Sequence, residues 1–312
     1  MTEIIDIHVH LCRDTQQEKV VFPKQGWPDD WHWGSPETVI PHMDANGVSH
    51  VVTQNVINHG AMTQARLRRA REQGTSDADI EQMKADLAED MKNRLRDMND
   101  WSLAAHAKEP RIIVFATIDP VLFTPDEAMT ELERVIAGGA SGVKVHPNIY
   151  GHYPDHPIMM QVYERIQAAG LGVLSDSSSR PHADGNQYGL PFGWRPVLKT
   201  FPHLKYIQAH LCDDSWDDQI DLSREFKDNL WFDMAGGFVD DHHPPSIHST
   251  LPVIQGVRVF RKVGVERILY GSDAPPAPDG MQGAYQVMTM AFTDDEKEAI
   301  LSGNAKRFLG LK

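Results

Sequence analysis

The sequence has little cysteine, no long apolar run and no excess of positive charge. Its only cysteines, Cys12 and Cys212, lie far apart and form neither a zinc-ribbon pattern nor a disulfide framework. No apolar run approaches the roughly 20 residues that cross a bilayer, so no membrane-spanning helix is expected. The formal net charge is −14, from 30 Lys and Arg against 44 Asp and Glu. This charge argues against a nucleic-acid or anionic-membrane surface, because both need a basic footprint.

Two other signals are missing. The opening residues, Met1-Thr-Glu-Ile-Ile-Asp6, contain neither the basic nor the apolar region of a secretory signal peptide. No GxGxxG or GxxxxGK[ST] motif follows an expected strand, so the sequence does not support nucleotide binding. Apolar residues make up 41% of the chain and are spread along it, which excludes disorder as the main state. We therefore expect a folded, cytoplasmic protein.

Eight short runs rich in Val, Ile and Leu alternate with helix-like segments along the chain. Most of these runs lack a polar face, which is typical of parallel strands covered on both sides. Eight strand–helix repeats in about 300 residues predict one α/β domain over residues 1–312, a closed (β/α)8 barrel or TIM barrel. The expected strands are Ile4–His10, Ser49–Ile57, Arg111–Ile118, Gly142–His146, Leu171–Asp176, Leu204–His210, Leu230–Met234 and Arg267–Asp273.

Residues 63–109 do not fit the minimal repeat and form a charged, proline-free insertion after the second expected strand. Their pattern predicts two helices that are broken near Gly74–Asp77, where Ser76 or Asp77 would cap the second helix. The simplest interpretation is a lengthened helical excursion with solvated charges. The alternatives are an active-site cover and a contact in a homodimer.

Side chains that can bind a metal ion occur at the ends of several expected strands. His8 and His10 are two residues apart on the first strand, so both are expected to point into the barrel. All strands of a parallel barrel finish at one face, where the active sites of this fold lie. The ends of strands four, six and eight would bring His146, His210 and Asp273 to the same face. Imidazoles with one or two carboxylates suit Zn²⁺, and they can also bind Mn²⁺ or Fe²⁺.

These motifs resemble the amidohydrolase superfamily, in particular the branch that includes aminocarboxymuconate-semialdehyde decarboxylase and aromatic acid decarboxylases. The resemblance extends from Ile4 to Leu311 and is carried by DIHVH, GVKVHP, AHLC, ILYGSDAP and ILSGNAKRFLGL. It implies a (β/α)8 barrel with one divalent metal ion, usually Zn²⁺, or Mn²⁺ in several decarboxylases. By this resemblance His8 and His10 are metal ligands, Asp273 is a ligand or proton shuttle, and His210 is a catalytic acid or base, or a ligand in binuclear members.

One position departs from the family pattern. The family usually has a histidine ligand at the end of strand five, where this chain has Asp176. An aspartate can still bind Zn²⁺ or Mn²⁺ through oxygen, so we expect Asp176 to be a ligand as well. The alternative is that the ligand is lost and that the site is altered or metal-free.

Three further residues are candidates for substrate binding. Lys144 and His146 share one face of strand four, with Lys144 one layer deeper. The simpler role for Lys144 is a charged group within the barrel or near a substrate carboxylate, and the alternative is a carbamylated bridging ligand. Arg180 follows strand five in a polar loop, and its guanidinium could hold a carboxylate bidentately.

The whole pattern predicts a metal-dependent hydrolase that cleaves a small carboxylated or cyclic substrate, a lactone, an amide or a C–C bond, with metal-activated water. The first alternative is a non-oxidative decarboxylase of an aromatic or muconate-type acid on the same metal site. Benzoate-type decarboxylases often carry Glu-x-His at strand one, so the His8-x-His10 motif favours hydrolysis. A metal-free, lactonase-like or non-catalytic barrel is the third interpretation. Specificity is expected to depend on residues 12–35, with Trp27, Trp31 and Trp33, and on residues 177–195 and 236–250.

Overall fold

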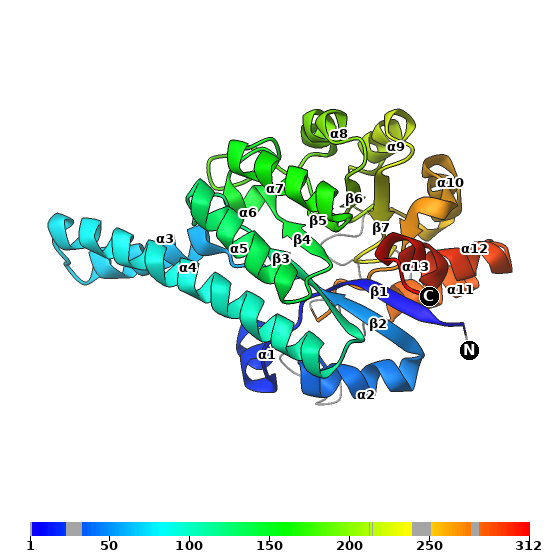
Figure 1. The fold of residues 1–312 in the computed structure, drawn as a ribbon, viewed down its shortest axis with the longest axis horizontal. Helices are drawn as coiled ribbons and strands as arrows, with labels where there is room; N and C mark the ends of the chain where they lie inside the picture. Colours follow the sequence, from blue (N-terminus) through cyan, green and yellow to red (C-terminus); the bar gives the residue numbers. More distant parts are fainter. Residues whose placement is uncertain (1, 23–32, 212, 214, 239–250, 276–280) are drawn as a thin grey trace.

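The computed structural model describes residues 2–22, 33–211, 213, 215–238, 251–275 and 281–312. Eight parallel strands form one sheet in sequence order and alternate with helices, so the predicted (β/α)8 barrel is confirmed (Figure 1). Backbone hydrogen bonds from Ile7 N to Tyr270 O and from Asp273 N to His8 O, both 2.9 Å, join the first strand to the last. The strands are β1 Ile4–Val9, β2 Val48–Thr53, β3 Ile112–Thr117, β4 Gly142–Val145, β5 Gly172–Ser175, β6 Lys205–Gln208, β7 Leu230–Asp233 and β8 Ile268–Leu269.

Helices surround these strands (Figure 1). Several begin at side chains that satisfy the first free backbone N–H groups. Thr293 forms a capping box with Glu296 at the start of α12, and Thr124 does the same with Glu127 at α5. The helices are α1 Thr15–Val21, α2 Pro36–Asn46, α3 His59–Glu72, α4 Asp77–Lys108, α5 Pro125–Ala137, α6 Pro147–Tyr150, α7 Pro157–Ala169, α8 Arg195–Thr200, α9 Trp216–Glu225, α10 Val253–Val263, α11 Gln282–Thr289, α12 Asp294–Glu298 and α13 Asn304–Leu309.

Helices α3 and α4 occupy the insertion after β2 and together form an arm that extends away from the barrel (Figure 1). The side chain of Ser76 accepts a hydrogen bond from Asp79 N and caps α4, as the sequence predicts. The outer part of the arm has a small core of its own, made of Leu67, Ala70, Ile80 and Leu87. The inner part packs on the barrel, with α4 against β3.

The interior of the barrel is filled at its amino-terminal end. Branched and aromatic side chains from several strands meet there with Phe308 of α13, and Gly142 and Gly172 leave room for them. A Cβ on Gly142 would lie 2.4 Å from Gly172 O, and one on Gly172 would lie 2.6 Å from Phe308. The amino-terminal end of the barrel is therefore too closely packed for a ligand, and the carboxyl ends of the strands are its open end.

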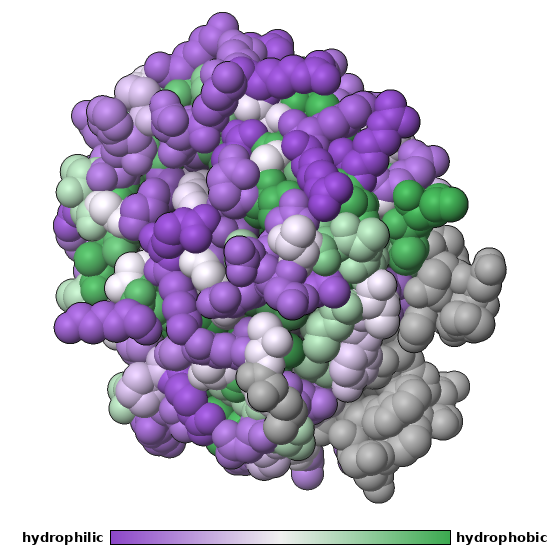
Figure 2. Space-filling model, turned by 90° about the vertical axis from the view of Figure 1, so that its right-hand side faces the viewer, coloured by the Kyte–Doolittle hydropathy of each residue, from purple (hydrophilic) through white to green (hydrophobic). Residues whose placement is uncertain are grey.

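The face that carries α11 to α13 is mainly hydrophilic, with separate hydrophobic side chains rather than one broad patch (Figure 2). In the part of the chain that the structure describes, no helix combines the length and the hydropathy needed to span a membrane. Of the three tryptophans in the first predicted specificity segment, the structure describes Trp33, whose ring stacks on that of His42. Trp27, Trp31, Cys212 and residues 239–250 lie outside the described residues.

Candidate active site

A cavity of about 550 Å³ lies at the carboxyl ends of the strands. Its floor comes from seven residues at or just beyond strand ends: His8, His10, Lys144, His146, Asp176, His210 and Asp273. Its walls come from the segment after β1 and from the arm, which supplies Met62, Arg94, Asp97, Met98 and Trp101. The structure therefore brings together every predicted site residue except Arg180, which is exposed and does not line this cavity.

His8, His10 and Asp273 form a compact group of possible metal ligands. The Nε2 atoms of the two histidines are 3.2 Å apart, and Asp273 Oδ1 lies 3.5 Å from His8 Nε2 and 3.2 Å from His10 Nε2. Donors arranged tetrahedrally at ~2.1 Å from one ion are separated by ~3.4 Å. The spacing and the chemistry of these three donors thus fit a divalent ion.

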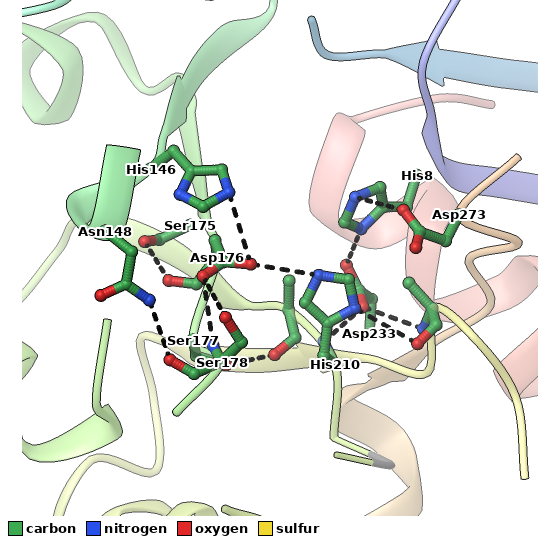
Figure 3. Close-up of polar contacts among 12 residues, drawn as sticks. His8, His146, Asn148, Ser175, Asp176, Ser177, Ser178, His210, Asp233 and Asp273 are labelled. Atoms are coloured by element: carbon green, nitrogen blue, oxygen red, sulfur yellow. Dashed lines mark hydrogen bonds and ion pairs between the residues drawn. The ribbon is translucent and has the colours of Figure 1, made fainter. Parts of the chain in front are cut away.

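Asp233 orients His8 from behind (Figure 3). Its Oδ2 accepts a hydrogen bond from His8 Nδ1 at 2.8 Å, while its Oδ1 accepts from the backbone N–H groups of His210 and Ala235. A proton on Nδ1 leaves the lone pair of His8 Nε2 directed at the other two donors, as in metal sites where a carboxylate holds the ligating imidazole. The sequence reasoning missed Asp233, although it ends β7 and the strand-end argument could have found it.

Asp176 lies beside His210 and His146 rather than within the ligand group (Figure 3). Its Oδ2 is 3.5 Å from His210 Nε2 and 3.7 Å from His146 Nε2. Its Oδ1 accepts hydrogen bonds from Ser178 N and Oγ, at 3.2 and 2.8 Å. Among the described residues, two sets of three side chains have possible ligand atoms that all lie within 4.8 Å of one another. One set is His8, His10 and Asp273, and the other is His8, His210 and Asp233. The ligand role expected for Asp176 stays a prediction.

The surroundings of the two other histidines separate their pKa values. Burial lowers the pKa of His146 to about 4, although the charge of Asp176 opposes this change. Burial acts in the same direction on His210, but the hydrogen bond to Asp176 and the charges of Asp273 and Asp176 outweigh it and raise the pKa of His210 to about 9. In the metal-free protein at neutral pH, His210 is therefore charged and His146 is neutral.

Lys144 is buried in the cavity floor, one layer below His146 as expected from strand parity. Its Nζ lies 3.4 Å from His8 Nε2 and its side chain is 1% exposed. Burial lowers the pKa of Lys144, and the charges of Asp176, Asp233 and Asp273 oppose this change. The Lys144 amine thus lies among carboxylates, next to the predicted ligand group.

Two residues of the site hold an uncommon backbone conformation. His210 and Asp273 have φ angles of 61° and 59°, and they are the only non-glycine residues with positive φ in the described part of the chain. This left-handed conformation costs of order 1–3 kcal/mol for each residue. The hydrogen bonds from His210 N to the Asp233 carboxylate Oδ1 and from Asp273 N to His8 O hold it in place. Both of the residues that adopt it therefore face the cavity.

The chain matches a family model described as an amidohydrolase over residues 5–311. A dihydroxybenzoic acid decarboxylase from a Polaromonas species, solved with manganese and 2-nitroresorcinol, is 16% identical, with a TM-score of 0.64 and coverage of 100% of this chain and 98% of that one. A 5-carboxyvanillate decarboxylase from Sphingomonas paucimobilis is 16% identical, with a TM-score of 0.61 and full coverage of both chains. A probable 2-pyrone-4,6-dicarboxylic acid hydrolase from Acinetobacter baumannii, with citric acid bound, is 16% identical, with a TM-score of 0.60 and coverage of 99% and 100%. No curated protein sequence matches the chain significantly.

Proposed function

Because the chain belongs to the amidohydrolase family and is an enzyme of the hydrolase or carboxy-lyase type, we propose that it hydrolyses a small carboxylated or cyclic compound with one divalent metal ion. The observation that supports this proposal is the compact group of His8, His10 and Asp273 on the cavity floor. His8 has its second nitrogen held by Asp233, so the group has both the donors and the outer support of a metal site.

A bound ion would supply Lewis-acid chemistry, in that it polarises a substrate oxygen and makes a nearby water more acidic. The protein's own part begins with Asp273, whose Oδ1 is among the donors and can accept the proton of an attacking water. Asp273 can afterwards pass this proton to the leaving group. Asp273 has a left-handed backbone conformation, and its carboxylate lies at the cavity floor.

His210 is the second catalytic residue of the proposal. It lies between Asp176 and the His8 ring, whose centroid is 5.0 Å from its own, and it lines the cavity (Figure 3). As an imidazolium held by Asp176 it can stabilise negative charge on a substrate oxygen or donate a proton. A cation bound nearby would lower the pKa of His210, which brings it from about 9 toward the range of a proton-transfer group. Asp176 then acts through His210, unless it shifts to join the ligands.

For the metal, the proposal is Zn²⁺ first and Mn²⁺ second. Two imidazoles and one carboxylate suit Zn²⁺, whereas a second carboxylate from Asp176 would favour the harder Mn²⁺ ion. The Polaromonas decarboxylase was solved with manganese, so both ions belong in the test. Elemental analysis of protein purified without added metal should find about one divalent ion per chain. Metal content near zero, with activity retained in a chelator, would overturn the proposal.

Decarboxylation is the second candidate, because two of the neighbouring structures are aromatic acid decarboxylases. The His8-x-His10 motif favours hydrolysis, and the reaction products decide between them. We propose to incubate the metal-loaded enzyme with 2-pyrone-4,6-dicarboxylate and with 2,6-dihydroxybenzoate in ¹⁸O-labelled water. Hydrolysis predicts a product that carries the label, and decarboxylation predicts release of CO₂ with no label in the product.

A further inference from the structure

The cavity has a second charged region, away from the ligand group, where the arm meets the segment after β1. Arg13 follows His10 by three residues, and Asp97 lies on α4. The Arg13 guanidinium forms an ion pair with the Asp97 carboxylate, and both side chains line the cavity. Arg94 lines it as well and precedes Asp97 by three residues, which places both on one face of α4. Two guanidinium groups therefore border the cavity from two separate elements.

The Arg13–Asp97 pair is weakly held. The two side chains are 47% and 60% exposed, and ion pairs in such positions contribute only about 0–1 kcal/mol. The Arg13 backbone is anchored better, since its N–H donates to Gln17 Oε1 at 2.7 Å next to the N-cap of α1. The backbone of Arg13 is thus held by a hydrogen bond, while the ion-pair partner of its guanidinium is easily displaced.

Much of the remaining lining of the cavity is apolar. It includes Phe22, Ile57, Met98 and Trp101, from the end of α1, the segment after β2 and α4. An apolar body between two polar ends matches a small unsaturated or aromatic acid. One end would face His8, His10 and Asp273, and the other would carry a carboxylate, whose planar pair of oxygens fits the guanidinium fork.

On the basis of the proposed function, we propose that Arg13, assisted by Arg94, binds a second carboxylate of the substrate. Asp97 occupies that position in the ligand-free protein and is displaced on binding. The substrate class is then a small dicarboxylic acid with a flat apolar body, and the arm is part of the specificity site. The strand-end motifs do not include these three residues.

The test compares benzene-1,3-dicarboxylate with 3-carbamoylbenzoate, in which an uncharged amide replaces one carboxylate. Affinities are measured by calorimetry with and without Mn²⁺, and metal content is measured on the same samples. The wild-type protein should bind the dicarboxylate about 10- to 100-fold more tightly, the range for one charge-assisted hydrogen-bonded pair. Arg13→Met should remove this preference, and Asp97→Asn should increase it, because the competing carboxylate is gone.

The matched control is Arg165→Met. It breaks the exposed ion pair between Arg165 of α7 and Glu133 of α5, neither of which lines the cavity. It should leave the preference unchanged. The proposal is overturned if the wild type does not prefer the dicarboxylate, if Arg13→Met keeps the preference, or if Asp97→Asn reduces it. Absence of bound metal would instead refute the proposed function, so the two failures are distinguishable.

Discussion

The pairing of Asp176 with His210 gives a quantitative prediction that needs no substrate. Asp176→Asn keeps the shape of the side chain, and its remaining oxygen can still accept the hydrogen bonds from Ser178. The substitution removes one negative charge 3.5 Å from His210 Nε2. At an effective dielectric constant of about 20, two unit charges at this distance attract by about 4.7 kcal/mol, equivalent to a pKa shift of about 3.5. The pKa of His210 should therefore fall from about 9 to about 6 or below, since burial then dominates.

The assay is an NMR pH titration of the metal-free protein with labelled histidine, in which His210→Gln identifies the signal. Asp119→Asn is the matched control, because Asp119 is a buried carboxylate 3.2 Å from His59 Nε2 and does not line the cavity. It should leave the His210 titration unchanged. A His210 pKa that moves by less than half a pH unit in Asp176→Asn would refute the ion pair on which this reasoning rests.

The same variant tests the ligand role expected for Asp176. If Asp176 only holds His210, the affinity for Zn²⁺ or Mn²⁺ in a competition titration should change less than about threefold. If Asp176 is a ligand, the affinity should fall by more than the 10- to 100-fold typical of losing an outer partner. In the second case Asp176→His should restore binding and shift the preference toward Zn²⁺, because imidazole is the softer ligand.

Three other predictions concern the ligand group, its support and the arm. Asp273→Asn should lower turnover of whichever of the two test compounds the wild type converts by at least 10²-fold while circular dichroism stays unchanged, and activity within about tenfold of wild type would exclude proton transfer by Asp273. Asp233→Asn should weaken metal binding by about 10- to 100-fold in the competition titration, because His8 loses its orienting partner; unchanged affinity would contradict that role. Ser76→Ala should lower the free energy of unfolding of the arm by about 1 kcal/mol, seen as faster hydrogen exchange at the start of α4, whereas Ser141→Ala, which caps no helix, should leave that exchange unchanged.

The pH dependence of stability has a definite sign. The raised pKa of His210 means that the folded protein retains a proton that the unfolded chain releases above pH 6.5. The contribution of the His210 charge to the free energy of unfolding is complete below pH 6.5 and is lost as the pH rises to about 9. The melting temperature of the metal-free wild type should fall across this interval, and Asp176→Asn should show a weaker fall. Equal slopes in the two proteins would contradict the assigned titration.

The sequence alone determined the barrel and most of its floor. Runs of β-branched residues without a polar face favour buried parallel strands, and eight of them close into one barrel. Because every strand of such a barrel ends at the same face, residues as distant as His8 and Asp273 converge without any knowledge of their packing. The break of the insertion at Ser76 is equally local, since it depends on a capping side chain.

Only the tertiary structure decided how these residues divide into roles. Asp176 is at a strand end like His10, yet its carboxylate contacts His210 and His146, a choice that depends on side-chain directions across three strands. Arg13 lines the cavity, where it pairs with Asp97 of the arm, whereas Arg180 is exposed and does not line it. Such contacts join elements that no local periodicity relates, and the pKa values of the site arise from the same long-range packing.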